Sequence, residues 1–162
     1  MLLWFLGTSL VSVWYVFTDP RFDYRLLLVG SVLPDVIDLP GGYARWAHSL
    51  TVAVGTLAAV MLVTAGRKPI RRLLLGLPIG MLLHLVWDGA FASTKVFWWP
   101  FSGSWGSVRV PSLQRGWFDV VLELIGAALL VWAWRRFGLA RREARVQFLR
   151  HGVLTDTKPR PV

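Results

Sequence analysis

The sequence predicts an all-α membrane protein: a multi-pass bundle of transmembrane helices with about four full spans and one short, broken helix. Two observations carry this prediction. Of the 162 residues, 55% are hydrophobic and only 17% are charged, which is more apolar than the composition of ordinary soluble domains. In addition, four long stretches are almost free of charged side chains. The absence of cysteine excludes disulfides and thiolate metal sites.

Three of the predicted segments lie in the N-terminal part of the chain. Residues 1–18 carry no charge, and because they lack a basic start and a small-residue cleavage site, a span is favoured over a signal peptide. Residues 46–66 form a stretch of 21 residues without Asp, Glu, Lys or Arg, close to the length of about 20 that a span requires. Residues 26–39 are shorter and contain Gly30 and Pro34, which predicts a broken helix.

Two further spans carry polar side chains. Residues 73–91 are interrupted only by His84 and Asp88, and residues 117–134 only by Asp119 and Glu123. Within each pair the spacing is i,i+4, which places both side chains on one helix face. These segments are therefore predicted to be spans with a polar face near one end.

The net charge of +9 is explained by orientation in the membrane, because Lys and Arg gather in cytoplasmic loops. A five-segment topology with the C-terminus inside leaves only four basic residues outside: Arg45, Lys95, Arg109 and Arg115. Residues 1–137 are then one transmembrane domain. Residues 138–162 are a basic cytoplasmic tail, an amphipathic helix touching anionic headgroups through Phe137, Val146, Phe148 and Leu149, followed by disorder. Nucleic acid is not the expected partner.

Acidic and histidine side chains concentrate at one level of this topology. Because charged groups are costly within a bilayer, they usually face a cavity, a partner or an ion. In the predicted topology the outer ends of four segments carry seven such residues: Asp35, Asp38, His48, His84, Asp88, Asp119 and Glu123. Imidazole nitrogens and carboxylate oxygens bind divalent metals, which predicts a metal site at the outer membrane surface.

Plainer interpretations of single residues stay open. Asp35 and Asp38 follow Pro34 and suit a turn or a helix cap. His48 suits a hydrogen bond to a neighbouring helix, and Asp119 suits the favourable N-terminus of a helix. Small residues on the same faces, Ser31, Gly80 and Gly126, predict close helix approach.

The loop before the last span is rich in aromatic residues. Trp98 and Trp99 lie between two basic residues, Lys95 and Arg109. Such a loop suits the membrane interface, and its cations suit a phosphate group. These four residues are the predicted substrate-binding residues.

Four short motifs together resemble a known family. They are GSVLPDVID at 30–38, RWAHS at 45–49, HLVWD at 84–88 and WPF at 99–101. The family comprises bacterial inner-membrane proteins described as predicted metal-dependent hydrolases, some as LexA-binding or phospholipase-C-like. The resemblance implies a helical membrane domain, a divalent metal and hydrolysis, with matching polar positions at Asp35, Asp38, His48, His84 and Asp88. Fewer histidines than in fuller members favour one ion or a carboxylate-bound pair.

The sequence therefore predicts a metal-dependent hydrolase of a lipid or lipid-linked phosphoester at the outer membrane interface. The five matching residues bind the metal, zinc first, with manganese or magnesium as alternatives. Glu123 or Asp119 supplies the general base or a further ligand. Two other functions stay open: a non-catalytic membrane protein that carries protons or ions through this cluster, and a regulatory protein acting through its basic tail.

Overall fold

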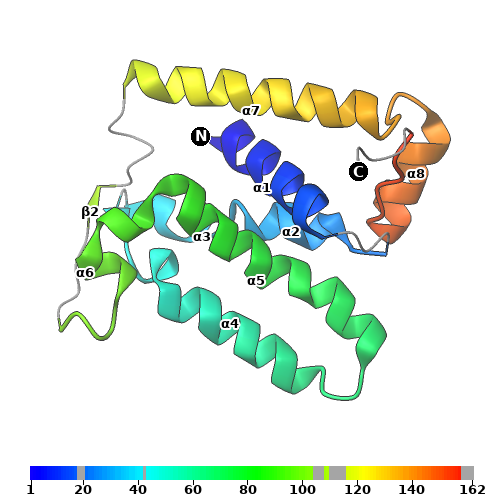
Figure 1. Cartoon of the computed structure of the whole chain (residues 1–162). Coiled ribbons are helices and arrows are strands. Elements are labelled where there is room, and N and C mark those ends of the chain that lie inside the picture. The colour runs from blue at the N-terminus through cyan, green and yellow to red at the C-terminus, as the bar shows by residue number, and fades with distance from the viewer. Residues whose placement is uncertain (18–20, 42, 104–107, 110–115, 158–162) are drawn as a thin grey trace.

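The computed structural model describes residues 1–17, 21–41, 43–103, 108–109 and 116–157 (Figure 1). The α-helices are α1 (Leu2–Val16), α2 (Tyr24–Gly30), α3 (Leu33–Asp38), α4 (Leu50–Val63), α5 (Lys68–Asp88), α6 (Thr94–Phe97), α7 (Trp117–Arg136) and α8 (Arg142–His151). Between them lie the 3-10 turns η1 (Leu39–Gly41), η2 (Trp46–His48) and η3 (Ala90–Ala92) and the antiparallel strands β1 (Tyr43–Ala44) and β2 (Val108–Arg109). The predicted all-α class is confirmed, since the strands form only a two-residue ladder between loops.

The long helices lie beside one another in the order α7, α1, α5 and α4, with α2 packed on α5 (Figure 1). At one end of the bundle, η2 contacts α3, α4 and α6. At the other end α8 lies across the bundle (Figure 1). The elements that carry Asp35, His48 and His84 therefore meet at the end opposite α8.

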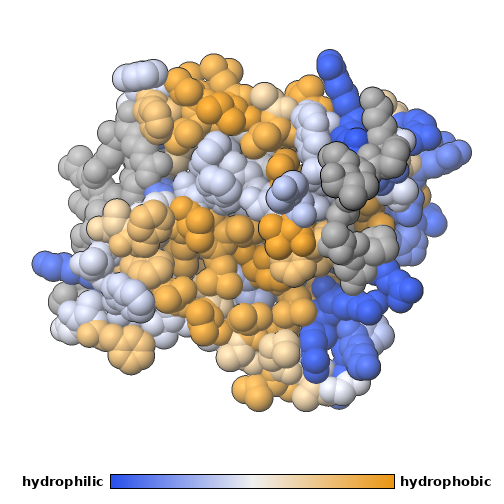
Figure 2. Space-filling view, viewed as in Figure 1, coloured by the Kyte–Doolittle hydropathy of each residue, from blue (hydrophilic) through white to orange (hydrophobic). Residues whose placement is uncertain are grey.

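Among the described helices, two are long and apolar enough to cross a membrane, α5 with 21 residues and α7 with 20. At about 1.5 Å per residue they extend about 30 Å, the thickness of a hydrocarbon core. The other two predicted spans are shorter apolar helices, α1 with 15 residues and α4 with 14. Hydrophobic residues cover the middle of the molecular face in Figure 2, while hydrophilic residues gather at the α8 end.

α4 is shorter than the apolar stretch 46–66 because Ser49 defines its start. The Ser49 hydroxyl oxygen accepts a hydrogen bond from the backbone N–H of Val52 at 3.2 Å, which caps the helix. The three residues before Ser49 form η2, and this turn brings His48 into the protein, where its side chain is 1% exposed. Residues 46–48 therefore form a turn that places His48 in the protein interior, instead of a first turn of α4.

The broken helix predicted for residues 26–39 is confirmed. α2 ends at Gly30 and α3 begins at Leu33, with Pro34 in its first turn, where the missing backbone N–H does no harm. Asp35 follows directly in the first turn of α3. The break therefore places this carboxylate on a short helix of its own.

Glycines allow the closest helix crossings. A Cβ atom on Gly80 of α5 would overlap the carbonyl oxygen of Leu27 and lie 2.7 Å from the backbone nitrogen of Ser31, both on the α2 segment. A Cβ atom on Gly126 of α7 would overlap the backbone of Leu3 in α1. The predicted close approach at Ser31, Gly80 and Gly126 is confirmed, and it is backbone against backbone.

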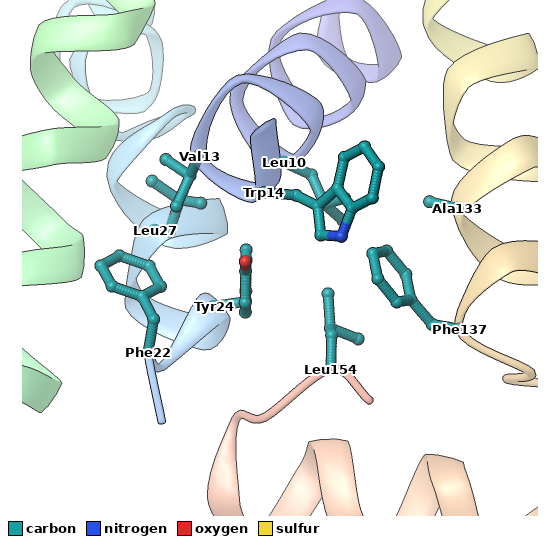
Figure 3. Packing of buried hydrophobic residues seen from close by; sticks show 9 residues of the cluster. All are labelled: Leu10, Val13, Trp14, Phe22, Tyr24, Leu27, Ala133, Phe137 and Leu154. Atoms are coloured by element: carbon teal, nitrogen blue, oxygen red, sulfur yellow. The ribbon is translucent and has the colours of Figure 1, made fainter. Parts of the chain in front are cut away.

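A hydrophobic cluster joins α1, α2, α7 and the C-terminal segment near α8 (Figure 3). Phe137 is 1% exposed in this cluster and Phe148 packs against it, so these two rings face the protein core rather than lipid headgroups. Val146 and Leu149, in contrast, are exposed. The predicted amphipathic helix is present as α8, but part of its apolar face is already covered by the bundle.

The segment after α8 contacts the bundle as far as the structure describes it, and the disorder predicted for the end of the chain stays a prediction. Leu154 lies in the buried cluster and Asp156 pairs with Arg136. The Arg25 guanidinium donates hydrogen bonds of 3.0 Å to the backbone carbonyls of Leu149 and Arg150 at the end of α8. These tertiary contacts, invisible in composition, hold the segment against the bundle.

Candidate metal centre

Three short distances define the candidate site. The Nε2 atom of His48 lies 3.3 Å from Oδ1 of Asp35 and 3.3 Å from Nε2 of His84, and the third pair, His84 Nε2 and Asp35 Oδ1, is 3.7 Å apart. The three atoms come from α3, η2 and α5. These residues could hold a metal ion, because each offers a ligand atom within 4.8 Å of the other two.

The far nitrogen of each imidazole is held by a hydrogen-bond acceptor. Nδ1 of His84 lies 2.8 Å from the backbone carbonyl oxygen of Ser31, and Nδ1 of His48 lies 2.7 Å from Oδ2 of Asp38. Since a carbonyl or carboxylate oxygen only accepts, both Nδ1 atoms carry the hydrogen. Metal-binding histidines in proteins are oriented in this way, by a carboxylate or a carbonyl behind the ring.

This arrangement turns three lone pairs towards one point. When both rings are neutral, each Nε2 is an acceptor and the oxygen of Asp35 is an acceptor as well, so a hydrogen bond among the three atoms requires an added proton. Acceptor atoms 3.3–3.7 Å apart repel one another unless a cation lies among them. The chemistry of the donor set therefore fits a cation.

The pKa of the His48 imidazole also indicates that this site favours a positive charge. Burial disfavours the charged ring, but hydrogen bonds with Asp35 and Asp38 and their negative charges outweigh it and raise the pKa of His48 to about 9. A proton on Nε2 of His48 is thus one positive charge that can lie between the three atoms. A metal ion is the other, and it has to displace that proton.

The geometry also suits a small ion with an open coordination position. With bonds of about 2.0–2.1 Å, tetrahedral ligands lie about 3.3 Å apart, close to the three observed separations. His48 and His84 are 1% and 0% exposed, while the side chain of Asp35 is 20% exposed. The aromatic ring of Phe5 covers His84 at 4.1 Å between ring centroids. Access is therefore on the Asp35 side, where a water or substrate atom could complete the coordination.

Two predicted ligands lie outside the group of three. Asp38 stands behind His48 and also accepts a hydrogen bond of 2.7 Å from the backbone N–H of Arg45, so it orients a ligand. Asp88 is 1% exposed, one helical turn beyond His84, and it does not join the 4.8 Å group. The i,i+3 spacing of Asp35 and Asp38 does not say which of them lies beside both histidines, and the i,i+4 spacing of His84 and Asp88 does not bring both side chains to one point.

The predicted general bases also lie outside this group. Glu123 accepts a hydrogen bond of 2.9 Å from the backbone N–H of Leu3 and lies 3.4 Å from the amino group of Met1. Asp119 lies in the first turn of α7. A catalytic role for Glu123 or Asp119 stays a prediction.

The predicted substrate-binding residues lie at the same end of the bundle. Lys95 and Trp98 are exposed and line a shallow pocket with Phe101. The carbonyl oxygen of Trp99 accepts a hydrogen bond of 2.7 Å from the Thr51 hydroxyl, which ties the loop to the first turn of α4. Arg109 lies in β2, and its side chain falls outside the described residues.

Sequence reasoning missed Phe5 and the carbonyl of Ser31. No sequence signal marks Phe5 as the cover of His84, because that contact joins two distant helices. The carbonyl had a signal, since the last carbonyls of a helix lack helical partners and Pro34 has no N–H to offer. A helix break before an aspartate is thus a place to look for a backbone acceptor.

Replacing Asp38 with asparagine is expected to weaken metal binding about 10- to 100-fold, as loss of an outer partner of a ligating histidine does. The amide removes the negative charge behind His48 while keeping the side chain's size. Competition with a chelator at fixed pH measures the affinity. Glu143→Gln, an equal change of charge on exposed α8, is the control and should bind like the wild type. Unchanged affinity in Asp38→Asn would refute the orienting role.

Comparison with protein-family models, with curated proteins and with solved structures finds no match to this chain. The function proposed below therefore rests on the motifs of the sequence and on the side-chain geometry of Asp35, His48 and His84.

Proposed function

We propose that the chain is a membrane-embedded, metal-dependent hydrolase in which Asp35, His48 and His84 bind one divalent ion, zinc in the first place. The observation that supports it is the convergence of three lone-pair atoms within 3.7 Å, with one side exposed. A metal with an open position lowers the pKa of a bound water and polarises the bond to be cleaved. Three protein ligands are typical of catalytic sites, whereas structural zinc sites have four.

The chain's own residues prepare the site for this chemistry. Asp38 and the Ser31 carbonyl hold the two rings by their Nδ1 atoms, which leaves each Nε2 atom on the side of Asp35, and Phe5 shields His84 from water. Asp35, the exposed member, lies where the substrate enters. Glu123 is the general base that we favour over Asp119, because it accepts a hydrogen bond from the backbone N–H of Leu3 in α1, the helix whose Phe5 covers His84.

The substrate class that we propose is a lipid or lipid-linked phosphoester. Lys95 is an exposed cation beside two exposed aromatic rings, Trp98 at 50% and Phe101 at 82% exposure. Aromatic side chains favour the interface of a membrane, and an ammonium group binds phosphate. α6 thus offers a headgroup contact at the end of the bundle that holds the metal group.

We further propose that the bundle spans the inner membrane with α6 outside and α8 in the cytoplasm. In this arrangement α5 and α7 cross fully, and the shorter α1 and α4 cross most of the apolar layer. The basic residues after α7 then lie inside, as short basic segments do.

Cysteine labelling tests this orientation, because the chain has no native cysteine. A membrane-impermeant maleimide added to intact spheroplasts is expected to label Thr94→Cys in α6 and to leave Glu143→Cys in α8 unlabelled. Both positions are exposed, so both should react once the membrane is opened. The reverse pattern, or labelling of both in intact cells, would contradict the orientation.

Hydrolysis is tested with purified protein and phospholipid in mixed micelles. Release of the headgroup phosphate should stop on chelation, return with zinc and fall by more than about 100-fold in Asp35→Asn, beyond the usual effect of an outer partner. Equal turnover in Asp35→Asn and the wild type would refute the proposal. Release of fatty acid instead of phosphate would assign the enzyme to carboxylic esters.

A role in carrying protons or ions is the weaker alternative. It requires polar groups leading from the metal group towards α8. In α1, the buried hydroxyl groups of Thr8 and Ser9 follow Phe5, and towards α8 come the apolar residues Leu10 and Val13, which pack with Leu27 (Figure 3). This apolar cluster on the α8 side suits a reaction at the outer surface better than a path through the bundle.

A further inference from the structure

A second site lies at the opposite end of the molecule, on the side of α7. A groove of about 410 Å³ is lined by Ala128, Val131, Trp132, Arg135, Arg136 and Thr157. Its volume falls within the range of about 300–1,000 Å³ typical of small-molecule sites. One wall is apolar, and the end near α8 carries two guanidinium groups.

The apolar wall belongs to the exposed side of a helix that can span a membrane. Ala128, Val131 and Arg135 recur at i, i+3 and i+7, so they form one stripe along α7. This stripe faces away from Gly126 and Ala133, which contact α1 and the hydrophobic cluster. An acyl chain lying along the stripe would lead a lipid headgroup to Arg135.

The two arginines differ in what they already bind. Arg136 pairs with Asp156 and stacks over Trp14, 5.5 Å from the ring centroid. Arg135 is exposed and has no acidic partner among the described residues. Arg136 is therefore already paired, whereas the guanidinium group of Arg135 can bind an anion in the groove. Trp132 is held by an edge-to-face contact with Trp14 at 5.1 Å, which makes the wall rigid.

We propose that this groove binds the phosphate group of an anionic phospholipid in the leaflet on the α8 side. Arg135 contacts the phosphate, and the acyl chain follows Val131 and Ala128. Thr157 bounds this end of the groove, and its hydroxyl donates a hydrogen bond of 2.6 Å to the Arg136 carbonyl. Guanidinium recognises phosphate by paired hydrogen bonds, and basic pockets at helix ends select anionic lipids. The proposal rests on the membrane orientation above but not on hydrolysis.

Native mass spectrometry of the full chain in detergent tests this site. With phosphatidylglycerol added, we expect one tightly held lipid per chain, and phosphatidylcholine should compete poorly. Arg135→Gln should weaken this binding about fivefold or more, the worth of one basic residue at a membrane surface. Arg142→Gln, which removes an equal charge from exposed α8, should leave it unchanged.

Three results would overturn the proposal: equal binding of phosphatidylglycerol to Arg135→Gln and the wild type, equal loss in Arg142→Gln, and displacement of the lipid by inorganic phosphate alone. Arg135→Lys should retain part of the affinity, since charge remains and the paired donors are lost. Cysteine labelling tests the membrane orientation separately from lipid binding. A reversed orientation would move the groove to the other leaflet without changing lipid binding in detergent.

Discussion

Purified His84→Ala protein is expected to hold no stoichiometric divalent metal, whereas the wild type should hold one ion per chain. His84 supplies one of only three ligand atoms in the described cluster, and the remaining pair of His48 and Asp35 binds an ion weakly. Hydrolysis should fall with metal content. Elemental analysis after dialysis against excess zinc measures the stoichiometry.

The chain offers a matched control for this experiment. Of its three histidines only His151 lies away from the site, exposed at the end of α8, so His151→Ala should keep its metal. His84 is fully buried, and its removal also leaves a cavity. Asp35→Asn is therefore measured in parallel, because it keeps volume at a partly exposed position. Full metal content in both site variants would refute the assignment of the centre.

A large loss of stability that also reaches the metal group is expected from Gly80→Ala. The added Cβ would overlap the Leu27 carbonyl, and because this neighbour is backbone, α2 and α5 must move apart. Overpacking of this kind lowers the free energy of unfolding by about 1–3 kcal/mol. Metal affinity should fall with it, since the displaced segment includes Ser31, whose carbonyl holds His84.

Gly55→Ala is the matched control for this substitution. Gly55 lies in α4 with nothing within 4 Å of an added Cβ, so alanine should stabilise the helix by up to about 1 kcal/mol. Thermal unfolding in the same detergent compares the two variants. If both melt like the wild type, α2 and α5 are not packed as closely as the structure has them.

Much of the fold follows from hydropathy and from single residues. The all-α class, the broken helix at Gly30 and Pro34 and the helix from Trp117 follow from composition and periodicity. The lengths of α1 and α4 do not, because an apolar residue in a helix and one in a turn have the same hydropathy. Ser49 caps the start of α4, but the sequence alone does not reveal this, because a serine inside an apolar stretch suits both a cap and a helix interior.

The candidate site, like the fold, follows from the sequence only in part. Asp35, His48 and His84 stand out in the sequence because ionisable groups within apolar segments need a partner, and the topology puts them at one level. Three other features depend on the direction of a side chain. Asp38 lies behind His48, Asp88 lies outside the group of three, and Glu123 contacts α1. Direction is set by turns and helix crossings that join distant parts of the chain.

The amino-acid sequence shows which ionisable groups enter the apolar segments and predicts the end of the bundle at which they lie. Which of these groups share a point depends on packing, because two atoms can bind one ion only when they lie about 3.3 Å apart. The close approach at Gly80 and the turn before Ser49 set that distance. Packing also decides that the C-terminal segment lies on the bundle, where Leu154 and Asp156 find partners that no local pattern reveals.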